Sequence, residues 1–424
     1  MKDKRLALIF STVWPEPDSS AAGVRHMQWI HFLLEEGYRV TLVSPSKPKA
    51  EHDWGSVKLP PNVECLPLPL NQSEVTSKLR ELSPDLVLFD RFFLEEQYGH
   101  RVYEACPEAL VLLETMDLHL VRRARETVRE SYLTEATKQE YLYQSETALR
   151  ETAAIERVDY SFVVSSWEEE LLSSQFGIKE DKAKWVPFFY EEPVITESYH
   201  RAFETREDFV WIGNFRHAPN IDGIRWFRNS IWPKVREKLP NARLRIYGAY
   251  PSKEVMEWDQ PKKTGISVCG SALTLDEVFS SGRVNLAPLR FGAGVKGKLL
   301  EGFRFGVPAV STQVGVEGLL PVSSALAFPG VEANTAAAFA EACVDLYQNE
   351  SRWVKARDAA SVLMKTHYDA KIIKPGLSLL LKQLQEKKKA GELPRWNSRV
   401  LRHELSNSHK YFSKWIEEKE KPRS

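Results

Sequence analysis

The chain has 424 residues with 58 basic and 58 acidic side chains, and 43% of its residues are apolar. Because a single hydrophobic core stops growing near ~250–300 residues, this length predicts two or three domains. A net charge of zero gives no overall field that would attract nucleic acid, so any affinity for a polyanion must come from a local cluster. The four cysteines are too far apart for a zinc ribbon or a thioredoxin motif. No apolar run approaches the ~20 residues that cross a bilayer, and the first residues lack the apolar core of a secretory signal, so we expect a cytoplasmic protein.

The N-terminal half alternates short apolar runs with helical patterns. A helical repeat runs from Met27 to Leu34, and a long charged stretch from Arg122 to about Glu156 predicts one or two helices. Such alternation of strand and helix is typical of a parallel sheet with helices on its faces. The predicted strands are 5–10, 39–45, 85–90, 109–114, 160–166 and 184–190, and the other predicted helices are 74–82, 95–105 and 167–176.

The same pattern restarts after a polar stretch, 191–208, that shows little periodicity. We therefore expect an N-terminal domain at 1–195, a C-terminal domain at 196–375 and a helical extension at 376–424. The predicted strands of the second half are 208–213, 243–248, 265–270, 283–289 and 307–312, and its predicted helices are 222–239, 252–258, 274–281, 295–306 and two more after Thr335.

The end of the chain, 386–424, carries 11 Lys or Arg against 6 Asp or Glu and holds four aromatic residues, Trp396, Tyr411, Phe412 and Trp415. Two interpretations stay open for it. It is either a helical extension that packs on the N-terminal domain, or a segment that lies on an anionic membrane surface or grips a polyanionic acceptor.

The loop at 15–26 joins the first strand to the first helix, which in an open α/β sheet is where helical amide groups bind an anion. Gly23 is its single glycine, so the loop does not match the dinucleotide fingerprint Gly-x-Gly-x-x-Gly. A nicotinamide dehydrogenase is therefore disfavoured. Taken alone, Gly23 is either a turn residue or a point of close approach to a ligand.

Two loops of the second half carry stronger signals for a phosphate. In the loop 213–220, Arg216 offers a planar fork of donors that suits phosphate oxygens. In the loop 290–298, Gly292 and Gly294 let the backbone come near a ligand.

The same loop brings Lys296 and Lys298 to the start of a predicted helix, where the helix dipole already favours an anion. Glu301 projects from nearly the same helical face as Lys298. It is either a carboxylate that accepts the two vicinal hydroxyls of a ribose or the partner of Lys298 in a surface ion pair.

Residues 284–319, VNLAPLRFGAGVKGKLLEGFRFGVPAVSTQVGVEGL, resemble the nucleotide-sugar signature of the retaining GT-B glycosyltransferases of family 4, the glycosyl transferases group 1. Residues 211–248 are similar to the opening of the donor domain in the same enzymes, particularly bacterial members that act on surface polysaccharides. The resemblance extends from residue 5 to about residue 385. It implies an α/β fold of GT-B architecture, in which two Rossmann-like domains face each other across a cleft.

The resemblance implies that Arg216 and Lys298 bind the donor diphosphate and that Glu301 holds the ribose. It places Asp117 and His119 near the reacting sugar, where the two compete for one role. The implied catalytic residues are thus Arg216, Lys298, His119 and Asp117, and the implied donor-binding residues are Gly23, Gly213, Asn214, Gly270, Ser271, Arg290, Gly292, Ala293, Gly294, Val295, Lys296 and Glu301.

Two departures from the family pattern affect the donor loops. Many relatives carry a glutamate at the position of Ala293, so the usual carboxylate contact to the donor sugar is absent here. In the first donor loop the usual lysine is replaced near Pro219 and Asn220, which leaves Lys296 or Lys298 to supply the charge.

The function implied by the resemblance is transfer of a sugar, with retention, from a UDP-, GDP- or dTDP-linked donor to a glycan or lipid-linked acceptor. No Asp-x-Asp follows a strand, so we expect no metal and no cofactor beyond the donor, and we expect no nucleic-acid partner. The expected location is the cytoplasm, with peripheral contact to the inner face of the membrane through 386–424 as one alternative. A sugar-nucleotide epimerase of GT-B fold and a catalytically silent GT-B sugar-binding subunit remain the competing functions.

Overall fold

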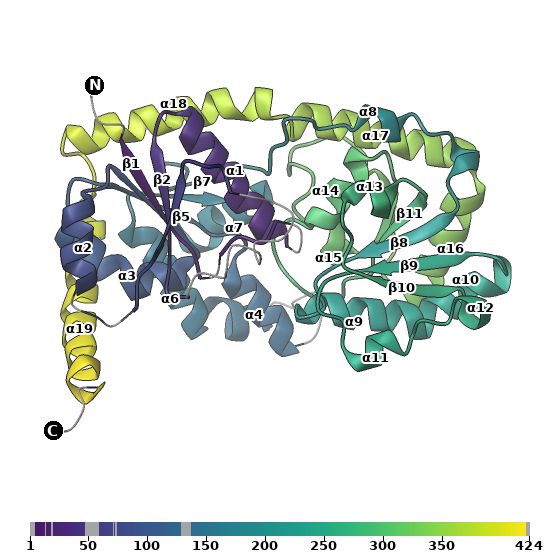
Figure 1. The fold of residues 1–424 in the computed structure, drawn as a ribbon, viewed down its shortest axis with the longest axis horizontal. Coiled ribbons are helices and arrows are strands. Elements are labelled where there is room, and N and C mark those ends of the chain that lie inside the picture. Colours follow the sequence, from purple (N-terminus) through teal and green to yellow (C-terminus); the bar gives the residue numbers. More distant parts are fainter. Residues whose placement is uncertain are drawn as a thin grey trace.

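The computed structural model describes residues 5–12, 14–17, 20–46, 59–70, 72, 74–128 and 137–420, and the statements below concern these residues. Two α/β domains lie side by side, and the C-terminal helices run back from the second domain onto the first (Figure 1). The predicted α/β class with two Rossmann-like halves is confirmed. Along the described residues no helix combines the length and the apolar character that a membrane span requires.

The N-terminal domain is built on a parallel seven-stranded sheet of order β3-β2-β1-β4-β5-β6-β7. The strands are β1 (Leu6–Phe10), β2 (Arg39–Ser44), β3 (Val63–Pro67), β4 (Leu86–Asp90), β5 (Leu110–Glu114), β6 (Tyr160–Val163) and β7 (Ala183–Trp185). The helices are α1 (Ala21–Glu35), α2 (Glu74–Leu82), α3 (Phe92–Ala105), α4 (His119–Val128), the π-helix Lys138–Tyr143, α6 (Glu146–Arg157) and α7 (Ser166–Phe176). The predicted helical stretch 122–156 is thus divided, and its residues 129–136 lie outside the described part of the chain.

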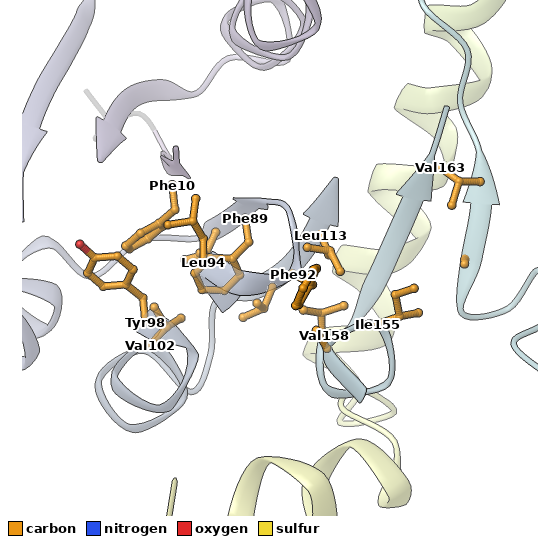
Figure 2. Close-up of a cluster of buried hydrophobic side chains, with 14 of the residues drawn as sticks. Phe10, Phe89, Phe92, Leu94, Tyr98, Val102, Leu113, Ile155, Val158 and Val163 are labelled. Atoms are coloured by element: carbon orange, nitrogen blue, oxygen red, sulfur yellow. The ribbon is translucent and has the colours of Figure 1, made fainter. Parts of the chain in front are cut away.

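Both faces of this sheet are covered by apolar side chains. On one face, the ring of Phe10 lies 5.0 Å from Phe89 and 4.9 Å from Tyr98 of α3, and these rings belong to the cluster shown in Figure 2. On the other face, Trp29 of α1 packs 4.8 Å from Phe162 of β6. A strand buried on both faces reads as a continuous apolar run, which is why β1, β4 and β5 were predictable.

The C-terminal domain holds a parallel six-stranded sheet of order β10-β9-β8-β11-β12-β13. Its strands are β8 (Asp208–Ile212), β9 (Arg243–Tyr247), β10 (Ile266–Gly270), β11 (Gly282–Ala287), β12 (Ala309–Ser311) and β13 (Gly330–Glu332). Its longer helices are α9 (Ala218–Trp226), α10 (Trp232–Lys238), α14 (Gly297–Arg304), α16 (Ala336–Gln348) and α17 (Glu350–His367). The short helices are α8 (Thr196–Tyr199), α11 (Lys253–Met256), α12 (Pro261–Thr264), α13 (Leu275–Phe279) and α15 (Gln313–Val316).

One helix of this domain departs from its prediction. The single helix predicted over 222–239 begins earlier, at Ala218, and contains a π-helical turn at Phe227–Ile231. Pro233 lies two residues after the end of that turn. Proline has no N–H to donate, and its ring crowds the carbonyl four residues before it. A wider turn accommodates both effects and divides the helix into α9 and α10.

The last two helices, α18 (Ala370–Lys389) and α19 (Trp396–Glu420), return to the N-terminal domain (Figure 1). Leu377, Leu381 and Leu384 of α18 are buried in the same cluster as Trp29. The α18 helix is therefore part of the N-terminal core although it follows the second sheet in sequence.

Candidate functional site

The two domains touch where the loop 290–297 of the C-terminal domain meets the carboxyl edge of the N-terminal sheet. A side-chain carbon at Gly294 would lie 2.7 Å from Cβ of Asp117, and one at Gly297 would lie 2.8 Å from Cβ of Ala21. Gly294 also has a φ of 67°, which a residue with a side chain adopts only with strain. Ala21 and Gly297 are the first residues of α1 and α14, so two helix starts meet at this junction.

Two lysines bring positive charge to the start of α14. The Lys298 ammonium donates to Oδ1 of Asn220 at 2.8 Å and lies 4.6 Å above the Trp211 ring. Burial, and then the nearby Lys296, lower the pKa of Lys298 to about 7. Lys296 is buried and donates to the carbonyl of Ala293 at 3.2 Å, and burial lowers its pKa to about 8. Burial thus disfavours the positive charge of both ammonium groups. An anion bound beside them would stabilise that charge and raise both pKa values.

Glu301 lies one turn into α14 and is buried. Its Oε2 accepts from Nη1 of Arg304 at 2.7 Å, whereas Lys298 bonds to Asn220. The interpretation of Lys298 and Glu301 as a surface ion pair is therefore wrong. The carboxylate is fixed from the Arg304 side.

The loop 213–220 lies beside α14, and its Arg216 guanidinium sits 3.7 Å over the ring of Tyr250. The Tyr250 hydroxyl donates to Oε2 of Glu16 in the N-terminal domain at 3.3 Å. Asn214 shapes the loop, since its Oδ1 accepts from the Arg216 N–H at 2.9 Å and its carbonyl accepts from Asn220 at 3.0 Å. Arg216 is exposed at the mouth of the junction, next to a link between the two domains.

Three neighbouring strand ends of the C-terminal sheet carry no side chains. A carbon at Gly248 would lie 2.0 Å from the carbonyl oxygen of Gly213, and the Gly248 N–H donates to the carbonyl of Gly270 at 2.7 Å. Gly270 has a φ of 72°, and a carbon added to it would meet nothing within 4 Å. Glycine therefore lets the first two strand ends approach each other closely and leaves space beside Gly270, which Ser271 follows in sequence.

Other predicted donor residues of this domain mainly hold the loop in place. Arg290 forms an ion pair with Asp222, with Nε 2.8 Å from Oδ2, and so its guanidinium is already engaged. Ala293 packs against the N-terminal core, and Val295 belongs to a cluster with Phe188. The carbonyl of Gly292 accepts from Nη1 of Arg125 of α4 at 2.8 Å.

Gly23 permits a close approach within its own domain. Gly23 lies in the first turn of α1, and a carbon at this position would lie 2.4 Å from the carbonyl of Glu16, so glycine is needed for the preceding loop to pack against the helix. The hydroxyl of Ser20 accepts from the Gly23 N–H at 3.0 Å and caps the helix. Asp18 and Ser19 of this loop lie outside the described residues.

Asp117 and His119 face the junction from the N-terminal domain. Nη1 of Arg122 lies 3.3 Å from the Asp117 carboxylate, and Nη2 of Arg122 lies 2.6 Å from Nε2 of His119. Burial lowers the pKa of His119 to about 4, so its imidazole is neutral at neutral pH. Burial would raise the pKa of Asp117, but Arg122 and His119 outweigh it, and the carboxylate is ionised.

A second acid–histidine pair lies beside the first and escaped the sequence analysis. Nε2 of His26 on α1 lies 3.3 Å from the buried carboxylate of Asp90, and Nη1 of Arg91 lies 3.0 Å from the same oxygen. Arg91 has a φ of 71°. Its strained backbone follows a strand end, where strain often accompanies function. Asp90 is the last residue of a predicted strand, which is the one signal that pointed to it.

Two buried carboxylates with distant partners carry no local signal in the sequence, and one of them, Glu317, joins the two domains. Arg125 donates to both carboxylate oxygens of Glu317, at 2.7 and 2.8 Å, and both side chains are largely buried. Glu151 accepts from the backbone N–H groups of His119 and Leu120 at 3.0 and 2.7 Å and so caps α4. Glu151 is separated from α4 by more than twenty residues, and no local pattern marks it.

Residues 206–349 match the family model of the glycosyl transferases group 1. A curated relative, the uncharacterized 44.6 kDa protein in the cps region of Klebsiella pneumoniae, is 26% identical over 147 residues, which are 33% of this chain and 37% of that protein. The aligned segment thus spans little more than a third of the relative.

Solved structures share the whole fold at low sequence identity. Sucrose-phosphate synthase from Thermosynechococcus elongatus superimposes with a TM-score of 0.65 at 14% identity, covering 90% of this chain and 99% of that one. Anabaena HepE, solved in complex with UDP and glucose, gives 0.62 at 10% identity over 89% and 99%. WaaG, a glycosyltransferase involved in lipopolysaccharide biosynthesis, gives 0.59 at 12% identity over 88% and 98%. The architecture is the GT-B fold.

Proposed function

We propose that the chain is a glycosyltransferase of the glycosyl transferases group 1 that transfers a sugar from a nucleoside diphosphate sugar to a hydroxyl group of a glycan or lipid-linked acceptor. The match of residues 206–349 to that family model and the GT-B fold shared with solved structures such as WaaG support the proposal. Transfer with retention and without a metal ion is part of the proposal. Among the described residues no three His, Cys, Asp or Glu side chains converge as metal ligands.

The observation that carries the proposal is the meeting of two helix starts beside two lysines. The first residues of α1 and of α14, Ala21 and Gly297, lie against each other at one junction, and a helix start favours an anion. The ammonium of Lys298 and that of Lys296 lie at the start of α14, on the same junction. A diphosphate would supply the negative charge and the hydrogen-bond acceptors that suit these two helix starts and two lysines.

Each remaining part of the donor has a matching surface nearby. The bare strand ends at Gly213, Gly248 and Gly270 would take the nucleobase, with Ser271 at their edge. The fixed carboxylate of Glu301 would accept the two ribose hydroxyls. Arg216 would swing from Tyr250 toward the phosphates when the donor binds.

Asp117 supplies the carboxylate that Ala293 lacks. It stands against Gly294, immediately after Ala293, and it is ionised. We place the transferred sugar between this carboxylate and the neutral imidazole of His119, which can exchange hydrogen bonds with sugar hydroxyls without adding charge.

In the proposed step the bond between the anomeric carbon and the phosphate oxygen breaks while the acceptor oxygen bonds to that carbon from the same face. The proton of the acceptor hydroxyl passes to an oxygen of the departing diphosphate. Lys298 and the α14 amide groups neutralise the charge that develops on this leaving group, and preorganised donors of this kind contribute most where water is excluded.

The neighbours indicate which substrates to test first. HepE was solved with UDP and glucose, and the pneumococcal O-GlcNAc transferase GtfA was solved with UDP and GlcNAc. The K. pneumoniae relative is encoded in a cps region, and WaaG acts in lipopolysaccharide biosynthesis, which favours a polysaccharide acceptor. All four cysteines are free thiols, which suits a cytoplasmic reaction.

A thermal-shift screen against UDP-, GDP-, dTDP- and ADP-sugars tests the proposal, because a ligand that binds the folded state raises the melting temperature. The active donor is then assayed with wild type, Lys298→Ala and Glu301→Ala, with the exposed Lys262→Ala and Glu341→Ala as matched controls. We expect both site variants to lose donor binding and turnover while the controls keep them. Conversion of the donor without an acceptor would indicate an epimerase, and binding without any turnover would indicate a silent sugar-binding subunit.

A further inference from the structure

Arg304, the last residue of α14, contacts three residues of the segment by which the chain passes from the first domain to the second. Nε of Arg304 donates to the carbonyl of Glu192 at 3.1 Å, and the guanidinium lies 4.4 Å over the ring of Tyr190. The Ile195 N–H donates to the carbonyl of Arg304 at 2.8 Å. One residue thus holds the stretch 190–195 against the end of α14.

The same guanidinium fixes the carboxylate that we assign to the donor ribose. Nη1 of Arg304 donates to Oε2 of Glu301 at 2.7 Å, and the two side chains are only 17% and 11% exposed. This bond uses Oε2 and leaves Oε1 of Glu301 without a contact to Arg304. Burial, and then the Glu301 carboxylate, raise the pKa of Tyr190 well above its usual range. The ring that supports Arg304 therefore also lies close to Glu301.

The chain directly before Tyr190 is held by α1 of the N-terminal domain. Nη1 of the buried Arg25 donates to the carbonyl of Pro187 at 2.7 Å. Nε2 of Gln28 donates to the carbonyl of Phe189, also at 2.7 Å. The backbone on this side of the crossing is therefore fastened to the first domain by two buried side chains of one helix.

The change from one domain to the other takes place between two neighbouring residues. Phe189 is buried in a cluster with residues of α1, and Tyr190 is buried in a cluster with residues of α14. These are the two helices whose starts meet at the proposed phosphate site. Both are attached to one short segment of chain, α1 through Arg25 and α14 through Arg304. A displacement of this segment reaches Glu301 through a single guanidinium.

The attachment of the segment to the C-terminal domain does not itself require an arginine side chain. The Tyr190 N–H donates to the carbonyl of Tyr368 at 2.8 Å, and the Ile195 N–H donates to the backbone of Arg304. Both bonds would form with any side chain at position 304. What the guanidinium adds is the link between the segment and Glu301.

We propose that Arg304 is a positioning residue that orients Glu301 toward the donor ribose and makes this orientation depend on how the segment 186–192 is held between the domains. This role rests on the proposed function, in which Glu301 holds the ribose. A carboxylate that is held at Oε2 cannot turn away from a hydroxyl group that is bonded to Oε1. Loss of that hydroxyl from the ligand then leaves a largely buried acceptor without its partner, which is costly.

Binding of nucleoside diphosphates with and without the ribose 2′-hydroxyl tests the proposal on the full chain. Calorimetry compares UDP, GDP and ADP with their 2′-deoxy forms, and inorganic pyrophosphate reports on the phosphate site alone. The test variants are Arg304→Gln and Tyr190→Leu, the second of which removes the ring under the guanidinium. The matched control is Arg352→Gln, which breaks the surface ion pair with Asp345.

We expect the wild type and the control to bind the ribose form of their nucleotide about tenfold or more tightly than its 2′-deoxy form. Both test variants should reduce this preference to about twofold, because Glu301 is no longer held, and should bind pyrophosphate as the wild type does. The double variant Arg304→Gln/Tyr190→Leu should lose no more of the preference than Arg304→Gln alone, since both changes act through one carboxylate.

Arg304→Lys provides a conservative variant. Its ammonium can still pair with Glu301, but it cannot also lie flat on the Tyr190 ring and donate to Glu192, so the preference should be intermediate. Urea unfolding shows whether each variant is folded. If Arg304→Gln does not fold, the preference of Arg304→Lys decides the question in its place.

Three results would overturn the proposal: equal affinity of the wild type for the ribose and 2′-deoxy forms, an unchanged preference in Arg304→Gln, or an equal loss of affinity for nucleotides and pyrophosphate. The last result would show that the arginine serves the fold alone. Additive effects of Arg304→Gln and Tyr190→Leu would refute the link to the crossing. A folded wild type that binds none of the nucleotides would refute the proposed function itself, so the two failures are distinguishable.

Discussion

The contact between Gly297 and Ala21 allows a direct test of the closed junction. A methyl group at position 297 would lie 2.8 Å from Cβ of Ala21, whereas unstrained carbon atoms approach to ~3.5–4.0 Å. Gly297→Ala must therefore separate the two helix starts by about 1 Å. Overpacking of this size costs ~1–3 kcal/mol. A misplacement of ~1 Å in a reacting pair lowers turnover on the order of 10²-fold.

A second substitution, at the opposing Ala21, should relieve this clash. Ala21→Gly removes the opposing carbon, and the next atom that the new methyl group would meet is Cα of residue 21 at 3.7 Å, an ordinary contact. We expect Gly297→Ala to lose most of the transfer activity and Gly297→Ala/Ala21→Gly to recover most of it. Gly376→Ala in α18 is the matched control, because a carbon there meets nothing within 4 Å.

The assay is the initial rate of transfer at saturating donor, together with urea unfolding of the wild type and the three variants to separate activity from folding. Recovery in the double variant would show that the lost activity came from the distance between the domains. Full activity of Gly297→Ala would refute the close approach as a requirement for transfer. A double variant no better than the single one would refute the assignment of the loss to Ala21.

Three further predictions concern the charged groups of the junction. Between pH 7 and 10.5, binding of a nucleoside diphosphate should take up a proton, because the pKa of Lys298 is about 7 in the free protein and a bound diphosphate raises that pKa. Calorimetry in two buffers of different ionisation enthalpy measures the proton uptake. Equal binding enthalpies in the two buffers would contradict the prediction. Burial raises the pKa of Glu168 to about 8, so the folded state loses stability as the pH rises from 4.5 to 8. Glu168→Gln should therefore raise the melting temperature more at pH 8 than at pH 5. The same difference in melting temperature between variant and wild type at both pH values would contradict this. Arg125→Leu leaves Glu317 unpaired at the junction, and breaking a buried ion pair costs ~3–5 kcal/mol. Solution scattering of this variant should show a more open molecule. The double variant Arg125→Leu/Glu317→Leu should be partly closed again, because no unpaired charge remains.

Strand positions were predictable from the sequence where both faces of the strand are buried, and less so at the sheet edges. The edge strand β3 was missed because Val63–Pro67 carries the exposed Glu64 and ends in proline, so it shows no apolar run. The edge strand β13 has only three residues and was missed for its length. The first helix begins at Ala21, six residues before the predicted repeat, because its first turns bury Arg25, His26 and Gln28 against the domain. Buried polar residues break an apolar pattern without breaking a helix.

The candidate site was predictable in its local parts and not in its partners. Glycines and lysines next to one helix start are visible in sequence because the helix dipole and close backbone approach act over a few residues. The partners of those groups come from the other domain. Asp117 opposes Gly294, and Glu317 binds Arg125 across 192 residues of chain, so only the folded arrangement identifies them.

The two points at which the chain passes between the domains lie side by side. The Tyr190 N–H donates to the carbonyl of Tyr368 at 2.8 Å, and the Ala370 N–H donates to the carbonyl of Tyr190 at 3.0 Å. Lys374 then fastens α18 to Glu35 of α1 at 2.7 Å. Because the paired crossings must bend together, we expect the C-terminal domain to move mainly by rotation about this pair.

Such a rotation would open the junction between the two domains. It separates the loop 290–297 from the carboxyl edge of the N-terminal sheet, and with it the ion pair between Arg125 and Glu317. The glycines at 294 and 297 allow the domains to close fully, and the ion pair sets how much free energy opening requires. In the proposed reaction, donor entry and product release require this pair to open, so we expect the charges that hold the junction closed also to limit how quickly the site can be emptied.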